Sequence, residues 1–332
     1  KIINVSSQIV CDMNSNIIKI FNSSIITKDP IHTGIGSYSY RLYNLGIFSE
    51  LTLFLQLSKS KMRKTEGFTH YFFINNWMLN YLYIGSSVIL PTTYSNYVKN
   101  KSLVHFTSPD WFHLAKYNKN SYGTIHDFFP LTRPDNNPLY YNIYFRNELK
   151  YVNKLRKVVV ISDYIKKQAN ELYPNAQIER IHNWTDDSYK PRDKDEARKK
   201  LGLPLDKIIL LNVSTDQSRK NIKILPKIMN KLDDQFLLIR IGKSEKILKD
   251  FKKNNYIIYN YVKKDELPLY YNAADMLLAP SFDEGFDFPI IEAINSGINV
   301  VASNIPVHKE IMFGHNYLVD PNDVEEWVNA II

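Results

Sequence analysis

Short apolar runs alternate with segments of helical spacing through the second half of the chain. The apolar runs are residues 207–214, 235–242, 256–259, 276–279 and 300–302. Helical spacing covers residues 221–232, 244–253 and 265–273, with Asp265 as the expected N-cap of the last. This alternation predicts a parallel sheet with helices on both faces. Ligands of such sheets bind at the carboxyl ends of the strands.

The first half is less regular and richer in aromatic residues. Its strand candidates are residues 17–21, 51–57, 103–106, 122–126 and 157–161, and its helix candidates are 36–45 and 163–172. A charged stretch from 186 to 200 has the composition of a connector. We therefore expect an α/β protein of two domains, residues 1–185 and 186–332, as the length of 332 residues suggests at roughly 100–200 residues per domain.

Charge and cysteine content narrow the class of protein. Lys and Arg outnumber Asp and Glu by 42 to 34, so the net charge of +8 favours anionic partners such as nucleotides and phosphorylated substrates. The single cysteine, Cys11, permits no internal disulfide and favours a reducing compartment. No apolar run reaches the ~18 residues of a membrane span. We expect a cytoplasmic protein, with peripheral contact to the inner face of a membrane as the alternative, and no nucleic-acid partner.

Residues 280–303 carry the most informative pattern. The segment reads PSFDEGFDFPIIEAINSGINVVAS, which predicts a loop with Glu284, a helix opening near Phe286 and Pro289, and Glu292 further along that helix. The unpaired N–H groups and the positive dipole at a helix start attract phosphate. A carboxylate such as Glu292 can accept two hydrogen bonds from the vicinal diol of a ribose. The segment therefore indicates a site for a phosphorylated, sugar-like ligand.

Three other places in the sequence support an anionic ligand. Arg219 and Lys220 follow the strand candidate 207–214, and cations at a helix start oppose the helix dipole, so a diphosphate explains them better than helix stability does. His126 ends the strand candidate 122–126 and can bond a sugar hydroxyl or phosphate. Gly34, in HTGIGS, would let the backbone approach a ligand closely.

The sequence does not indicate a metal site. Gly242-Lys243-Ser244 has Leu237 where a phosphate-binding loop needs glycine. The Asp193-Lys194-Asp195 stretch lies in the charged connector and has the composition of solvated surface. The eight histidines lack the spacing of a zinc site.

In this order, the segments resemble the retaining GT-B glycosyltransferases of family 4, also called glycosyl transferases group 1. The resemblance rests on the glycine loop, the His126–Asp127 pair, VVVISDYIKKQ, IHNW, RKN, PSFDEGFDFPIIEA and GINVVASNIPVHKEI. It implies a GT-B architecture, in which two Rossmann-like domains with parallel sheets face a central cleft.

The resemblance also implies roles for individual residues. Glu284 would face the donor sugar, Glu292 would bind the ribose, and Arg219 and Lys220 would neutralise the diphosphate. His126 would contact the sugar, and Gly34 would approach the phosphate. The amides of Phe286 and Asp287 would bind at the helix start, and the backbone of Tyr261 and Val262 would contact the base.

Three features depart from the family pattern. Asp287 stands where the family usually has glycine, and Thr215 where many members have arginine, so Arg219 and Lys220 would bear the phosphate charge without a third cation. Members often return a C-terminal helix to the first domain, and we expect that helix to be missing from a sequence ending at Ile332.

We therefore expect a retaining glycosyltransferase that moves a sugar from a nucleotide diphosphate sugar to an acceptor hydroxyl without a metal or other cofactor. The alternatives are a sugar-nucleotide epimerase of the same architecture and a non-catalytic sugar-nucleotide-binding protein. The sequence leaves open the donor base (UDP, GDP or ADP), the sugar, the oligomeric state and the acceptor, which is a glycan, a lipid-linked molecule or a small molecule.

Overall fold

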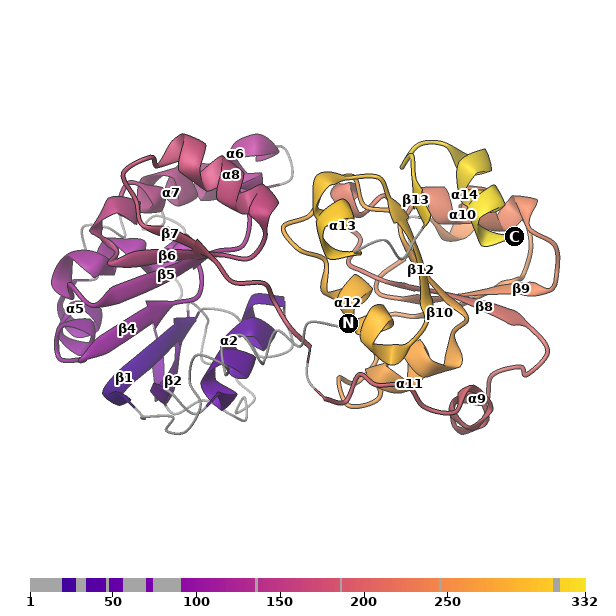
Figure 1. Ribbon diagram of the computed structural model, residues 1–332, viewed down its shortest axis with the longest axis horizontal. Coiled ribbons are helices and arrows are strands. Elements are labelled where there is room, and N and C mark those ends of the chain that lie inside the picture. The colour runs from indigo at the N-terminus through magenta and orange to yellow at the C-terminus, as the bar shows by residue number, and fades with distance from the viewer. Residues whose placement is uncertain are drawn as a thin grey trace. The chain divides into compact units, whose positions relative to one another are not determined.

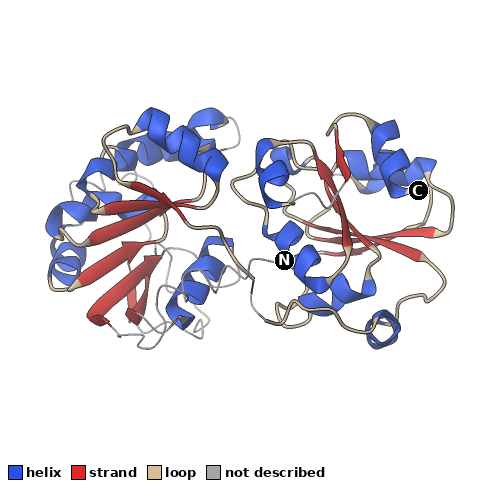
Figure 2. Ribbon diagram, in the orientation of Figure 1, coloured by secondary structure: helices blue, strands red, loops and turns tan. Residues whose placement is uncertain are grey.

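The computed structural model describes residues 20–27, 34–45, 48–55, 70–73, 91–134, 137–185, 187–244, 247–312 and 317–332. The chain divides into two compact units, Lys1–Asn183 and Trp184–Ile332, so the second unit begins slightly before residue 186. Each unit is a sheet with helices packed around it (Figures 1 and 2). The expected α/β class is therefore confirmed for both units.

The first unit holds a parallel sheet in the order β3-β2-β1-β4-β5-β6-β7. Its strands are β1 (Ile20–Thr27), β2 (Phe48–Leu55), β3 (His70–Phe73), β4 (Leu103–Phe106), β5 (Ser121–Ile125), β6 (Lys157–Val160) and β7 (Ile178–Arg180). Its helices are α2 (Gly34–Asn44), α5 (Pro91–Lys99), α6 (Phe129–Thr132), α7 (Leu139–Leu149) and α8 (Asp163–Leu172), with 3-10 turns η3 (Pro109–Tyr117) and η5 (Val152–Lys154). The predicted helix over residues 163–172 is confirmed, and β3 and β7 are strands that the sequence analysis missed.

The second unit holds a parallel sheet in the order β10-β9-β8-β11-β12-β13. Its strands are β8 (Ile208–Val213), β9 (Phe236–Ile241), β10 (Tyr256–Tyr259), β11 (Met276–Ala279), β12 (Asn299–Ser303) and β13 (Tyr317–Val319). Its helices are α9 (Lys194–Leu201), α10 (Ile224–Lys231), α11 (Leu267–Ala273), α12 (Phe288–Ser296), α13 (Pro306–Ile311) and α14 (Val324–Ile331), with 3-10 turns η6 (Ser218–Lys220) and η7 (Leu248–Asp250). Each strand predicted in this half is confirmed to within a residue or two.

Two predictions of helix structure are wrong in this unit. The described part of 244–253 holds only the short turn η7. The like charges of Lys249, Lys252 and Lys253, three and four positions apart, oppose a longer helix there. Helix α11 has Glu266 rather than Asp265 as its N-cap, because Pro268 is suited to the first turn and sets the start of the helix.

The charged connector contains a capped helix. Asp193 accepts a hydrogen bond from the backbone N–H of Glu196 at 2.8 Å, which satisfies one of the unpaired donors at the start of α9. Gly202 ends the helix in the left-handed conformation, with φ of 65°. Asp193 is thus exposed, as expected, and has a structural role as a cap.

The core of the second unit fixes the sheet against α10 and α14. Leu210 of β8, Ile228 of α10 and Trp327 of α14 are fully buried in one apolar cluster. The Trp327 indole N–H donates to the carbonyl oxygen of Asp320 at 2.9 Å, so the ring is buried with its polar atom satisfied. Among the described residues, no helix combines the length and apolar character needed to cross a bilayer.

Candidate active site

The strand order of the second sheet reverses between β8 and β11. Strands β9 and β10 extend to one side of β8, and β12 and β13 extend beyond β11. In open parallel sheets the binding crevice lies at the carboxyl ends of the strands where the order reverses. The loops after β8 and β11 therefore form the candidate site. The backbone N–H of Phe282 donates to the carbonyl oxygen of Arg219 at 2.7 Å and joins the two loops.

Arg219 and Lys220 converge on the carboxylate of Glu284. Arg219 Nη1 lies 2.6 Å from Glu284 Oε2, and Lys220 Nζ lies 2.5 Å from Glu284 Oε1. Arg219 Nη1 also donates to the carbonyl oxygen of Asp283 at 3.2 Å. Glu284 is buried, whereas the Arg219 side chain is 17% exposed and so is accessible to a ligand. Side chains 65 positions apart in the sequence, each predicted as a site residue, are thus in direct contact.

Asp287 extends this charged group to the start of α12. Its Oδ1 lies 3.4 Å from Lys220 Nζ, and its side chain is buried. Its φ of 74° is in the left-handed region, which is uncommon outside glycine and tolerated by aspartate. Burial acts to raise the pKa of the Asp287 carboxyl, but Lys220 and His308 outweigh it and hold that pKa well below its usual range. Asp287 is therefore a buried carboxylate anion.

His308 of α13 is the other partner of Asp287. Its Nε2 lies 3.2 Å from Asp287 Oδ2, and its Nδ1 lies 2.9 Å from the carbonyl oxygen of Ser303. The ring is fully buried. Sequence reasoning missed His308 as a site residue, because it follows Asp287 by 21 positions and only the packing of α13 against the start of α12 relates them.

Glu292 lies on α12 and is also buried. The hydroxyl of Tyr271 donates to Glu292 Oε2 at 2.8 Å. Tyr271 is fully buried and packs edge-on against Tyr189, with ring centroids 5.6 Å apart. Burial, together with the Glu292 carboxylate, raises the pKa of Tyr271 well above its usual value, so its hydroxyl keeps its proton and remains a donor. Tyr271 was missed from the sequence.

Arg240 supports the loop after β8 through hydrogen bonds to backbone carbonyl oxygens. Its guanidinium is fully buried and donates to the backbone carbonyl oxygens of Ile241 and Thr215, the latter at 3.3 Å. Burial lowers the pKa of Arg240 to about 10, which leaves it charged at neutral pH. Gly242, with φ of 130°, passes so close to this loop that a Cβ there would lie 2.0 Å from the carbonyl oxygen of Ser214. Arg240 and Gly242 thus fix the backbone that leads to Arg219.

The remaining predicted residues of the second unit differ in their placement. Phe286 is buried, with its ring centroid 6.0 Å from that of Phe288, and precedes α12 together with Asp287. Tyr261 and Val262 follow the edge strand β10, and the Tyr261 side chain is largely exposed. Their backbone contact with a base stays a prediction.

In the first unit, His126 lies at the end of β5 in a polar network. Its Nε2 contacts the carbonyl oxygen of Thr107 at 2.8 Å, and its ring packs edge-on against Tyr38 at 4.9 Å. Burial lowers the pKa of His126 to about 4, although the bond to Thr107 acts in the opposite direction. The ring is therefore neutral at pH 7, with the proton on Nε2 and Nδ1 as its acceptor. A neutral ring suits contact with a sugar hydroxyl better than with a phosphate.

Gly34 is the first residue of α2, which packs beside β1. The residues between β1 and α2 lie outside the described part, as do Cys11 and His32. Strand β1 ends at Thr27. Its approach to a phosphate remains a prediction.

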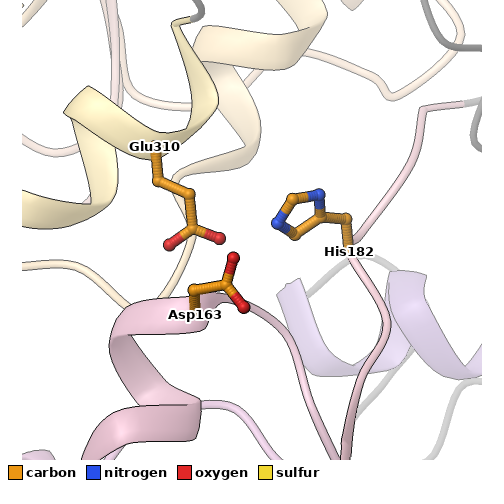
Figure 3. A group of neighbouring side chains, drawn as sticks. All are labelled: Asp163, His182 and Glu310. Atoms are coloured by element: carbon orange, nitrogen blue, oxygen red, sulfur yellow. The ribbon is translucent and has the colours of Figure 1, made fainter.

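Two ionisable residues of the first unit lie beyond β6 and β7. Asp163 begins α8 and His182 follows β7, as Figure 3 shows together with Glu310 of the second unit's α13. Arg180 Nε pairs with Asp163 Oδ1 at 2.9 Å. Asp163 is exposed and serves as a partner of Arg180 at the helix start, where a negative charge also suits the dipole.

The charges of the second unit's site can be summed. Arg219 and Lys220 balance Glu284 and Asp287, and the first N–H groups of α12 add positive potential beside them. A dianionic group can enter if the two cations exchange carboxylate oxygens for its own. Cations placed in this way can stabilise negative charge on a bound anionic group.

Comparison with known proteins finds similar chains for the second unit and for the fold. The family model described as glycosyl transferases group 1 matches residues 193–332, which include every charged residue of the site. The O-antigen chain mannosyltransferase RfbU of Salmonella typhimurium is 28% identical over 243 residues, covering 70% of this chain and 64% of that protein. The chain therefore spans less than two thirds of this relative's length.

Solved structures show the same fold at low sequence identity. Sucrose-phosphate synthase from Thermosynechococcus elongatus has a TM-score of 0.73 and 18% identity, covering 93% of this chain and 88% of the other. HepE of Anabaena, solved in complex with UDP and glucose, has a TM-score of 0.72 and 16% identity over the same shares of the two chains. The chain thus shares its fold of two parallel α/β units with these solved structures.

Proposed function

We propose that this chain, which resembles the glycosyl transferases of group 1 and carries their family match in its second unit, transfers a sugar from a nucleotide diphosphate sugar to an acceptor hydroxyl. The observation that carries the proposal is the convergence of Arg219 and Lys220 on Glu284 at the point of strand reversal. The diphosphate would lie against the two cations and the start of α12. The sugar would lie beside Glu284, and the ribose beside Glu292.

The carboxylates have a role before the donor binds. Glu284 holds both cations at the site, and each exchanges a carboxylate oxygen for a phosphate oxygen when a diphosphate arrives. Electrostatic stabilisation by charges placed in this way is usually the largest single contribution to lowering a barrier. When the sugar–phosphate bond breaks, the departing diphosphate gains negative charge, and Arg219, Lys220 and the helix N–H groups stabilise it.

We propose that the transfer retains the anomeric configuration. The family resemblance supports retention, and we favour attack of the acceptor from the face of the leaving phosphate, which takes the proton of the acceptor hydroxyl. A phosphate oxygen then replaces the general base that a different mechanism would require. The anomer of an isolated product, assigned by NMR, tests this step, and an inverted product would contradict it.

We propose also that no metal is needed, because two fixed cations lie where a metal would otherwise neutralise the diphosphate. The test is turnover in excess EDTA with the donor that supports activity. Full activity in EDTA is the expected result. Complete loss that added Mg²⁺ or Mn²⁺ restores would overturn this part of the proposal.

The relatives suggest which donors and acceptors to test first. RfbU is named an O-antigen chain mannosyltransferase, which makes mannose the first sugar to test and a growing, lipid-linked glycan the first acceptor. HepE was solved with UDP and glucose, so UDP-glucose is the second donor. When acceptor is present, a transferase releases nucleoside diphosphate at the same rate as it forms the glycosylated product. Release of an epimerised donor instead would favour the epimerase alternative, and binding without any turnover would favour a non-catalytic role.

A further inference from the structure

Both ring nitrogens of His308 face oxygen atoms that accept hydrogen bonds. Nδ1 lies 2.9 Å from the backbone carbonyl oxygen of Ser303, and Nε2 lies 3.2 Å from Asp287 Oδ2. A backbone carbonyl can only accept, and Lys220 holds the Asp287 carboxyl ionised, so this carboxylate can only accept as well. A neutral imidazole has one N–H and would leave one of these contacts without a proton. The contacts therefore favour the doubly protonated, positively charged ring.

This charge lies next to the proposed diphosphate position. Asp287 lies at the start of α12 and also contacts Lys220, one of the two cations assigned to the diphosphate. Without a charge on His308, the sum over Arg219, Lys220, Glu284 and Asp287 is zero. With it, the sum is +1. An anionic carboxylate beside an incoming diphosphate is repulsive unless a third cation compensates it.

We propose that His308 supplies this third positive charge and acts as a positioning residue for donor binding. The inference rests on the proposed function. The imidazolium draws the Asp287 carboxylate towards α13 and neutralises it, so Lys220 can turn to the diphosphate. The Asp287–His308 pair thus places a cation on α13, beside the start of α12.

The proposal predicts that donor affinity depends on pH through His308. The groups that face its ring are Asp287 from the start of α12 and the Ser303 carbonyl from β12, with Lys220 beyond Asp287 and with Lys309 and Glu310 adjacent on α13. A diphosphate binds more tightly to the protonated ring. Affinity should therefore be higher with the doubly protonated ring than with the neutral ring.

The test measures binding of UDP, GDP and ADP to the wild-type chain by calorimetry and continues with the tightest. His308→Gln keeps an N–H that can reach Asp287 but removes the charge, and we expect affinity to fall about tenfold, within the range of coupling between groups in contact. Lys309→Gln is the matched control, because it removes a positive charge from the exposed face of the same helix. We expect it to change affinity less than about twofold, as for screened surface charge.

A double-mutant cycle tests whether His308 acts through Asp287. Asp287→Gly removes the carboxylate at a position with φ of 74°, where glycine is unstrained, so this variant should fold. In the Asp287→Gly background, His308→Gln should change affinity little. An equal loss in both backgrounds would overturn the proposal, because the effect of His308 would then be independent of Asp287.

The pH profile provides a readout that a purely structural role would not move. The ratio of wild-type to Asp287→Gly affinity should fall as pH rises, and this ratio cancels any titration of the nucleotide itself. If the ratio of wild-type to Asp287→Gly affinity does not change with pH, the inference is overturned, and this test does not need His308→Gln to fold. If His308→Gln binds the nucleotide as tightly as the wild type, the inference is overturned but the proposed function is not. Failure of the wild type to bind any of the three nucleotides overturns the proposed function and the inference together.

Discussion

The hydroxyl of Tyr271 donates a hydrogen bond to Glu292 Oε2 over 2.8 Å, and both side chains are buried. Tyr271 lies on α11 and Glu292 on α12, so the bond ties Glu292, the residue proposed to bind the ribose, to a neighbouring helix. Tyr271 remains protonated because its pKa is raised. It therefore fixes the direction of the Glu292 carboxylate.

Tyr271→Phe should weaken nucleotide binding while keeping the packing of the ring. The lost hydrogen bond to a buried carboxylate costs about 1–3 kcal/mol, part of it as stability and part as affinity. Calorimetric titration with nucleoside diphosphate and thermal unfolding separate the two. Tyr270→Phe is the control, since Tyr270 lies on the same helix and its ring packs against Tyr259. Equal affinity losses in both variants would contradict the positioning role.

Glu292→Gln should lower affinity for a nucleoside diphosphate and leave affinity for inorganic pyrophosphate unchanged. The amide keeps the size of the side chain but replaces one acceptor oxygen with a donor, which cannot hold both hydroxyls of a ribose. We expect a loss of about 1.5–3 kcal/mol, as for hydrogen bonds to charged groups. Competition binding with the two ligands measures it. A parallel loss for pyrophosphate would remove Glu292 from the ribose site.

Arg219→Ala should reduce kcat/KM by about 10²–10³-fold, the effect of removing one preorganised donor to developing charge. The fold should persist, because Glu284 keeps its contact with Lys220. Steady-state kinetics with the active donor checks the rate, and circular dichroism checks the fold. Lys223→Ala removes a positive charge four positions away on an exposed side chain and should leave kcat/KM near the wild-type value. An unchanged kcat/KM in Arg219→Ala would exclude Arg219 from the site.

Acid should destabilise the first unit through its buried histidines. Burial lowers the pKa of His105 to about 3 and that of His126 to about 4, whereas both titrate near 6.5 in the unfolded chain. The unfolded state therefore binds more protons below about pH 6.5, and stability falls as pH drops from there towards about 4. Each histidine contributes up to about 1.4 kcal/mol per pH unit.

Calorimetric unfolding of the wild type at pH 7, 6 and 5 measures this loss as a falling transition temperature. His126→Gln removes one of the two titrating groups and should give a shallower dependence on pH. Parallel curves for the two proteins would show that His126 does not contribute. The bond between His105 Nε2 and Thr124 Oγ1, at 2.8 Å, should persist in the variant. His105 should therefore still contribute its part of the pH dependence of the transition temperature.

Much of the second unit could be predicted from sequence because its signal is local. The apolar runs that became β8, β9, β10, β11 and β12 are each bounded by polar residues, and Glu284, Arg219 and Lys220 lie in the loops that follow such runs. Parallel strands bring their carboxyl ends to one edge, so loops at those ends meet whatever the intervening length. This general rule, rather than any pairwise signal, made the contact between Arg219 and Glu284 foreseeable.

Other features could not be predicted, because they depend on packing between distant segments. His308, Tyr271 and Arg240 act through contacts with Asp287, Glu292 and Thr215, and nothing at their own positions in the sequence marks them. The left-handed backbone of Asp287 is likewise set by its partners, since aspartate by itself rarely adopts it. Strands β3, β7 and β13, none of which was predicted, each lie at an edge of their sheet.

The single backbone bond from Phe282 N–H to the Arg219 carbonyl has a consequence for engineering this protein. A chimera that imports one of these two segments from a related transferase would keep the side chains of the graft but misalign the opposite segment. Loop swaps intended to change which sugar is accepted should therefore exchange residues 214–220 and 280–287 together, as a matched cassette.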